Sequence, residues 1–199
     1  MKAICIFVFA SILSISALAQ SLSSDGQVSF SGTKTQLQGL GESVRAKKVA
    51  FMTFDVYRAK LWANDKSLLE SKGELAILGV EQLQQIAIEM NFLRNVESEK
   101  IMTAFKEAIE YNSIENKGPI QEFISHIAML GEIKKEQRLV ILGSKEKDGV
   151  ETIYLQMNQT QIAKITGPKG FISQIFSIWL GKTGDENLAK LKKELLKNK

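Results

Sequence analysis

The alternation of hydrophobic and polar positions is clearest in residues 48–62, a stretch without Gly or Pro that is rich in β-branched and aromatic residues. Such a composition is typical of a long β-strand. With a period of two, one face would carry Val49, Phe51, Thr53, Asp55, Tyr57, Ala59 and Leu61, and the other Met52, Phe54, Val56, Arg58, Lys60 and Trp62. Because neither face is purely polar, the pattern predicts a central strand that is covered on both sides.

Further strands follow from the same reasoning. Residues 84–92 alternate well enough to predict a half-buried strand, and the short apolar run 75–80 predicts another. Three more strands, separated by turn-forming residues, are expected at 138–142, 152–157 and 161–165 as an antiparallel meander. Gly39 and Gly41 indicate a turn ahead of the central strand.

Helical spacing of apolar residues appears in the intervals between these strands. It predicts helices over 97–111 and 119–130, the second opened by Gly118-Pro119 and closed by Gly131. Two more helices are expected in the last part of the chain, one from Gly167-Pro168 to Gly181 and one introduced by the capping-box sequence 183–186. The whole pattern is one domain of mixed strands and helices.

The first 19 residues have the features of a signal peptide: a positive start, an apolar run and small residues at Ala17 and Ala19. We expect cleavage between Ala19 and Gln20 and a periplasmic or secreted protein. The expected organisation is then a signal peptide over 1–19, a polar leader with a possible short strand over 20–38, and a single domain over 39–199.

Composition excludes several classes of function. Cys5 lies in the segment expected to be removed, and His126 is the single histidine, so disulfides, zinc, iron–sulfur clusters and thiol chemistry are excluded and no cofactor is expected. The net charge is +4, or about +3 without Lys2, which is too small to predict a nucleic-acid partner. No stretch after the signal peptide is apolar enough to predict a membrane span.

Motifs of common catalytic sites are missing from the sequence: it has no Gly-x-Ser-x-Gly elbow, phosphate loop or dinucleotide-binding fingerprint. His126 follows Glu122 by four residues on a predicted helix. We interpret it as a member of a surface pair and expect that Gln could replace it.

Four blocks of sequence, in order, resemble the bacterial chalcone-isomerase-like family of exported proteins. They are Gly41-Glu42 with residues 51–63, then 88–96, 135–139 and 176–181, and the last is followed by a Leu-rich helix. The resemblance covers roughly residues 39–196. It implies an α+β fold, an open-faced β-sandwich in which a long antiparallel sheet is covered by a layer of helices.

The resemblance also implies candidate binding residues. True chalcone isomerases use an Arg with Thr, Tyr and Asn to cyclise a flavonoid precursor, whereas related non-enzymatic members bind fatty acids through an Arg and a Tyr. Here the corresponding candidates are Arg45, Tyr57 and Thr53, with Arg94 at the end of a strand. The spacing of Arg45 and Tyr57 is short for the plant enzymes, and Thr53 is one residue away from the expected position.

Each candidate also has a purely structural interpretation. Arg45 could be a solvated charge at a strand end, and Arg94 could pair with Glu97 or Glu99. Trp179 is expected to fill the core under the last helix.

The leading hypothesis is a non-catalytic protein that binds a small apolar or amphipathic molecule, such as a fatty acid, between sheet and helices. One alternative is an intramolecular lyase or isomerase on the same scaffold. The other is a structural or partner-binding protein.

Overall fold

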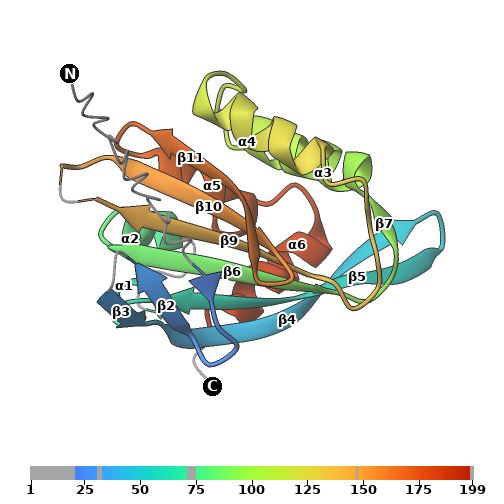
Figure 1. Ribbon diagram of the computed structural model, residues 1–199. Helices are drawn as coiled ribbons and strands as arrows, with labels where there is room; N and C mark the ends of the chain where they lie inside the picture. Colours follow the sequence, from blue (N-terminus) through green and yellow to red (C-terminus); the bar gives the residue numbers. More distant parts are fainter. Residues whose placement is uncertain (1–20, 31–32, 71–74, 147, 198–199) are drawn as a thin grey trace, which may run out of the picture.

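A six-stranded antiparallel sheet organises the fold, with the spatial order β11-β10-β9-β6-β5-β4 (Figure 1). The computed structural model describes residues 21–30, 33–70, 75–146 and 148–197. The strands of this sheet are β4 (Gln38–Val49), β5 (Met52–Ala63), β6 (Gln85–Phe92), β9 (Arg138–Lys145), β10 (Glu151–Met157) and β11 (Thr160–Gly167). Each strand pairs with its neighbours in antiparallel register. The predicted meander is therefore confirmed. The long strand predicted over residues 48–62 is confirmed from Met52 onwards as β5, but residues 48 and 49 end β4 and residues 50 and 51 form the loop between the two strands. The half of β5 nearer this loop is largely exposed, so the expected cover on both sides holds only towards Ala63.

Helices are layered on one face of this sheet, which gives the predicted α+β architecture (Figure 1). They are α1 (Ser67–Glu70), α2 (Ala76–Val80), α3 (Ser98–Tyr111), α4 (Pro119–Ala128), α5 (Phe171–Leu180) and α6 (Glu186–Leu195). The sequence-based predictions of these last four helices are confirmed, except that Gly167 ends β11 and α5 begins at Phe171 and not at Gly167-Pro168. A two-stranded sheet of β7 (Val96–Glu97) and β8 (Glu132–Ile133) joins the segments around α3 and α4.

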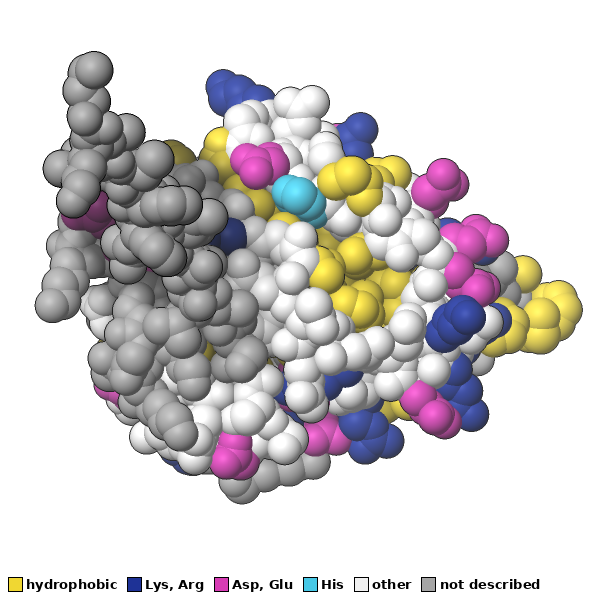
Figure 2. All heavy atoms as spheres, viewed as in Figure 1, with side chains coloured by type: hydrophobic (Ala, Val, Ile, Leu, Met, Phe, Trp, Pro, Cys, Tyr) yellow, Lys and Arg dark blue, Asp and Glu magenta, His cyan; other side chains and the backbone are white. Residues whose placement is uncertain are grey.

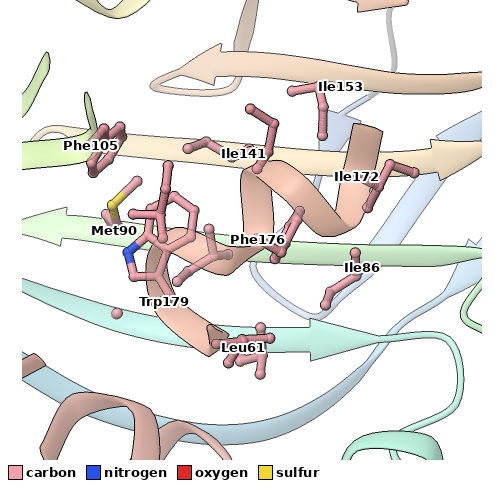
Figure 3. Close-up of a cluster of buried hydrophobic side chains, with 14 of the residues drawn as sticks. Leu61, Ile86, Met90, Phe105, Ile141, Ile153, Ile172, Phe176 and Trp179 are labelled. Carbon is pink, nitrogen blue, oxygen red and sulfur yellow. The ribbon is translucent and has the colours of Figure 1, made fainter. Parts of the chain in front are cut away.

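The main core lies between the sheet and α5, which is buried on nearly every side. Figure 3 shows its side chains Ile172, Phe176 and Trp179 directed at residues of the strands such as Ile86 and Met90. A buried carboxylate fixes the start of this helix, because Glu151 of β10 accepts a hydrogen bond from the Ile172 N–H at 2.7 Å. A negative charge there also complements the helix dipole.

The opposite face of the sheet carries a second layer that the sequence suggests only faintly. A three-stranded sheet of β1 (Ser21–Leu22), β2 (Gln27–Phe30) and β3 (Thr33–Gln36) packs there (Figure 1). Leu22 and Val28 are fully buried against Trp62 and neighbouring strand residues. The polar leader thus contains the expected short strand, β2, together with β1 and β3. The boundary between this leader and a domain that begins at residue 39 stays a prediction.

Three local predictions are wrong, and packing explains each. Residues 75–80 contain the short helix α2 and not a strand, since their apolar residues pack against α1 and α5. Strand β6 is buried on both faces because β1 to β3 cover its second side. Gly39 and Gly41 lie within β4 and not in a turn. A side chain at Gly41 would collide with the Glu194 carbonyl, so glycine allows the last turn of α6 to lie on the strand.

The predicted capping box before α6 is replaced by a simpler cap. Asp185 is the N-cap, and its carboxylate accepts a hydrogen bond from the Leu188 N–H at 2.8 Å. Asp is among the best residues at this position because it satisfies a backbone donor that has no partner in the helix. Both oxygens of the same carboxylate also accept hydrogen bonds from Arg45 of β4.

Strand β5 contains an irregularity that determines which side chains face the helices. Arg45 of β4 is opposite Tyr57, but the next residue, Ala46, is opposite Asp55. Val56 is therefore an extra residue, a β-bulge, and the alternation of faces reverses there. The single alternating pattern predicted for residues 48–62 is wrong on the hairpin side of this bulge.

Among the described residues, no helix combines the length and the apolar character needed to cross a bilayer. The expected signal peptide, with Cys5 and the cleavage position, lies outside the described residues.

Candidate functional site

A cleft of about 780 Å³ lies between the outer part of the β4–β5 hairpin and helix α3, with α5 and α6 at its inner end. Its apolar walls comprise Phe54 and Val56 of β5, Ile101, Phe105 and Ala108 of α3, Ile178 of α5 and Leu188 of α6. About half of the residues that line the cleft are polar or charged. A cleft of this size that combines apolar and polar side chains is suited to a small organic ligand.

Arg45 lies at the inner end of the cleft, and its side chain is only 11% exposed. Its guanidinium makes a two-pronged ion pair with Asp185, with Nη1–Oδ1 and Nη2–Oδ2 distances of 2.9 and 2.6 Å. Nη1 also donates to the Ala46 carbonyl at 2.7 Å. The interpretation of Arg45 as a solvated strand-end charge is therefore wrong, since the group is partly buried and already holds a carboxylate.

The pairing with Arg45 lowers the pKa of Asp185. Partial burial tends to raise the pKa of its carboxyl, but the hydrogen bonds from Arg45 and from the Leu188 N–H, together with the charge of Arg45, outweigh burial and hold the pKa below its usual range. Asp185 is therefore ionised at neutral pH. The carboxylate of Asp185 thus caps α6 and at the same time pairs with Arg45 at the inner end of the cleft.

Tyr57 faces Arg45 across the two strands and is buried. Its hydroxyl oxygen accepts a hydrogen bond from Trp179 Nε1 at 3.2 Å, so the hydroxyl proton can be directed elsewhere. Burial raises the pKa of Tyr57, an effect only partly offset by the Trp179 hydrogen bond and by Arg45, with Asp185 raising it further. Tyr57 is thus a neutral hydrogen-bonding group at physiological pH.

Trp179 positions this hydroxyl from the core. The indole is fully buried and stands edge-on to Phe105, with ring centres 5.1 Å apart (Figure 3). Its predicted role in the core is confirmed. The indole also links the cleft wall on α3 to Tyr57 on the sheet.

The rim of the cleft is charged and exposed. Arg94 stacks over Phe54, with its guanidinium carbon 4.8 Å from the ring centre. Glu97, one of the two carboxylates predicted to pair with Arg94, instead binds Lys100 at 2.9 Å. Lys47 of β4 also lines the cleft, and these groups surround its opening with charges of both signs.

Thr53, the fourth candidate, is exposed and is not part of the cleft lining. The bulge at Val56 is the reason, because it gives Phe54 and Val56 the face that simple alternation assigns to Thr53. The structure therefore brings Arg45, Tyr57 and Arg94 to one cleft and leaves Thr53 outside it.

Two residues that shape this site, Asp185 and Trp179, were assigned no binding role from the sequence. Asp185 lies 140 residues from Arg45 along the chain. The sequence predicts a capping box in which Thr183 is the cap, so neither the capping role of Asp185 nor its pairing with Arg45 was predicted. Trp179 carries a weak signal, since a buried indole N–H requires an acceptor.

His126 is partly exposed on α4, with Nε2 3.9 Å from a Glu122 carboxylate oxygen, as the sequence indicates. Figure 2 shows it on the surface of the helical layer. Within the described parts of the chain, no group of three His, Cys, Asp or Glu side chains is arranged to hold a metal ion.

Comparison with known proteins agrees with this architecture. The chain matches the family described as chalcone isomerase-like over residues 19–197, and it belongs to that family. Among solved structures it is similar to the fatty-acid binding protein AtFAP1 of Arabidopsis thaliana, with a TM-score of 0.60 and 13% sequence identity, over 89% of this chain and 97% of that one. At this identity the likeness shows a shared fold. No curated protein matches the chain.

Proposed function

We propose that the protein binds a small apolar or amphipathic molecule, such as a fatty acid, in the cleft between the β4–β5 hairpin and α3, and does not transform it. One observation carries the proposal. The apolar walls of the cleft lead inward to a buried pair of polar groups, Arg45 and Tyr57. A ligand with an apolar chain and one polar end would bury both parts in suitable surroundings.

The inner end of the cleft favours an acidic or hydroxyl-bearing group. A carboxylate taken from water needs a cation or several donors, because burying it unpaired costs several kcal/mol. Arg45 already holds a carboxylate, that of Asp185, in two-pronged geometry. A ligand carboxylate would share or replace that partner, and Tyr57 could donate a further hydrogen bond.

The comparisons support this ligand class. The protein whose structure resembles this one is described as a fatty-acid binding protein. Binding without catalysis is favoured by the raised pKa of Tyr57, which keeps its hydroxyl neutral and unsuited to act as a base. The position of Thr53 outside the cleft argues in the same direction.

Titration of a fluorescent fatty acid into wild-type protein and two variants tests the proposal. Arg45→Met removes the charged partner and should weaken binding by about 3 kcal/mol, at least about 100-fold. Tyr57→Phe removes one neutral hydrogen bond and should cost about 1 kcal/mol. Equal affinity in all three proteins would exclude these residues from the site, and absence of binding by wild type would favour the partner-binding alternative.

Two controls sharpen the result. A fatty alcohol of the same chain length lacks the charge, so its affinity should be nearly the same in wild type and Arg45→Met. His126→Gln lies on α4, away from the cleft lining, and should bind as wild type does. A change of more than about tenfold in His126→Gln, roughly 1.4 kcal/mol, would show that His126 contributes to binding.

We further propose that the protein is exported and cleaved after Ala19, for which the sequence pattern of residues 1–19 is the support. The N-terminal sequence of protein recovered from the periplasmic fraction should begin at Gln20. Uncleaved protein in the cytosol would contradict this proposal.

A further inference from the structure

The tip of the β4–β5 hairpin is the most exposed apolar feature of the described chain. Ala50 and Phe51 form the two-residue loop, the Phe51 side chain is 89% exposed, and Met52 is 50% exposed. Both strands extend beyond the end of the sheet at this point (Figure 1). Figure 2 shows hydrophobic side chains protruding from the molecule at the same place.

An apolar strip connects this tip with the cleft. Met52, Phe54 and Val56 are two residues apart and share one face of β5. Their exposure decreases inward, from the half-exposed Met52 through the intermediate Phe54 and Val56 to the buried Tyr57. The tip is therefore continuous with the binding cleft.

On the hairpin itself the charges nearest the tip are positive, whereas the exposed carboxylates Glu97 and Glu99 lie on the α3 side of the cleft. Lys47 and Lys48 precede it on β4 and are exposed, and Arg94 covers Phe54 beside the strip. The exposed acid on the hairpin, Asp55, is opposite Ala46 and farther from the tip. An aromatic and a thioether side chain in front of two lysines match the interfacial layer of a bilayer, where apolar groups enter the acyl boundary and lysines meet anionic headgroups.

We propose that the hairpin tip docks on membranes that contain anionic lipids, with Phe51 and Met52 inserted at the interface and Lys47 and Lys48 at the headgroups. This orientation places the apolar strip between the bilayer and the cleft. If the proposed function holds, the strip is the path by which an acyl chain passes from one to the other. The docking itself does not depend on the identity of the ligand.

A tryptophan at the tip reports insertion directly. Phe51→Trp in the full chain is mixed with vesicles of phosphatidylglycerol whose acyl chains carry bromine, which quenches tryptophan within the bilayer. The native Trp62 and Trp179 are 5% and 0% exposed, so the quencher does not reach them. We expect the emission added by the new tryptophan to fall at least twofold, and to fall much less with zwitterionic phosphatidylcholine or in high salt.

The matched control is Leu78→Trp, which places an exposed tryptophan on α2, at the opposite end of the sheet from the tip (Figure 1). Its emission should be unchanged by the same vesicles. Equal quenching in both variants would show attachment through another part of the chain and overturn the proposal. Unquenched Phe51→Trp would overturn it as well and would favour a protein partner at the tip.

A separate measurement distinguishes this proposal from the proposed function. Phe51→Ser with Met52→Ser should bind a soluble fluorescent fatty acid with wild-type affinity when no vesicles are present, because Phe51 and Met52 are not in the cleft lining. Loss of vesicle binding with retained ligand affinity supports docking as a distinct property. Wild-type vesicle binding by this double variant would contradict it.

Discussion

Two arginine–carboxylate pairs lie on opposite faces of the same sheet. Two hydrogen bonds join Arg45 to Asp185, whereas one joins Arg138 to Glu89. Arg45–Asp185 measures 2.6 Å on the helical face, and Arg138–Glu89 measures 2.8 Å on the face covered by β1. The two arginine side chains are buried to a similar degree, at 11% and 13% exposure. The carboxylates differ, since Asp185 is 39% exposed and Glu89 is 12% exposed.

The surroundings explain the difference. Arg138 also donates to the Leu22 carbonyl at 3.2 Å, and Glu89 accepts from Asn91 at 2.9 Å, so the leader strand closes over this pair. The Arg45 pair lies at the inner end of an open cleft, and its carboxylate belongs to the beginning of a helix. A closed pair holds two layers together, whereas a pair beside a cleft can exchange one partner for a ligand.

The largest expected effect is on stability. Arg138→Met leaves Glu89 buried without its cation and should lower the free energy of unfolding by about 3 kcal/mol. Arg45→Met leaves a carboxylate that water can reach, so it should cost about 1 kcal/mol. Urea unfolding followed by circular dichroism measures both. Equal losses would show that the two pairs do not differ in the way proposed.

The next largest expected effect is an increase in ligand affinity. Asp185→Asn removes the charge that occupies Arg45 but keeps a good N-cap for α6. Affinity for an anionic fatty acid should therefore rise about tenfold, or about 1.4 kcal/mol, and affinity for the matching alcohol should stay the same. Calorimetric titration of both ligands distinguishes the release of Arg45 from a general change in the cleft. An unchanged affinity for the acid would mean that Asp185 does not compete with the ligand.

The smallest expected effect is on the loss of stability at acidic pH. Burial tends to raise the pKa of Glu89, but hydrogen bonds from Arg138 and Asn91 and nearby positive charges outweigh burial and lower it. The unfolded chain therefore takes up its proton first, near pH 4, and stability falls as pH decreases from there towards the folded-state pKa. Unfolding measured from pH 6 to pH 3 should show a shallower loss in Glu89→Gln than in wild type. Asp185→Asn should reduce this acid-dependent loss of stability by less than Glu89→Gln does. A larger reduction in Asp185→Asn would contradict the comparison of the two pairs.

Much of the fold could be predicted because its signals are local. Helical spacing and the turn residues Gly118 and Gly131 were enough to predict α4, and α5 was predicted in the same way from its apolar residues. The pairing of Arg45 and Tyr57 in one site came from resemblance to a family, since their proximity depends on the register of two strands. Local patterns describe elements well, but they do not describe the contacts between elements.

The wrong predictions arose where contacts between elements decide the local structure. Gly41 indicates a turn from sequence alone, and only the nearby α6 explains a glycine inside a strand. The second partner of Asp185 depends on a contact between distant parts of the chain. The leader is polar on average, yet its Leu22 and Val28 are fully buried against the sheet. In each case the deciding interaction is tertiary.

The bulge at Val56 has a consequence for how such proteins diverge. A strand presents alternate side chains to each face, so one inserted or deleted residue exchanges the two sets of side chains beyond it. The extra residue Val56 therefore decides which side chains between Met52 and Val56 face the cleft. Deleting Val56 would be expected to restore the simple register and to turn Thr53 and Asp55 towards the cleft in place of Phe54. A lineage could thus exchange an apolar wall for a hydroxyl and a carboxylate through one in-frame deletion, with no amino-acid substitution at any remaining position.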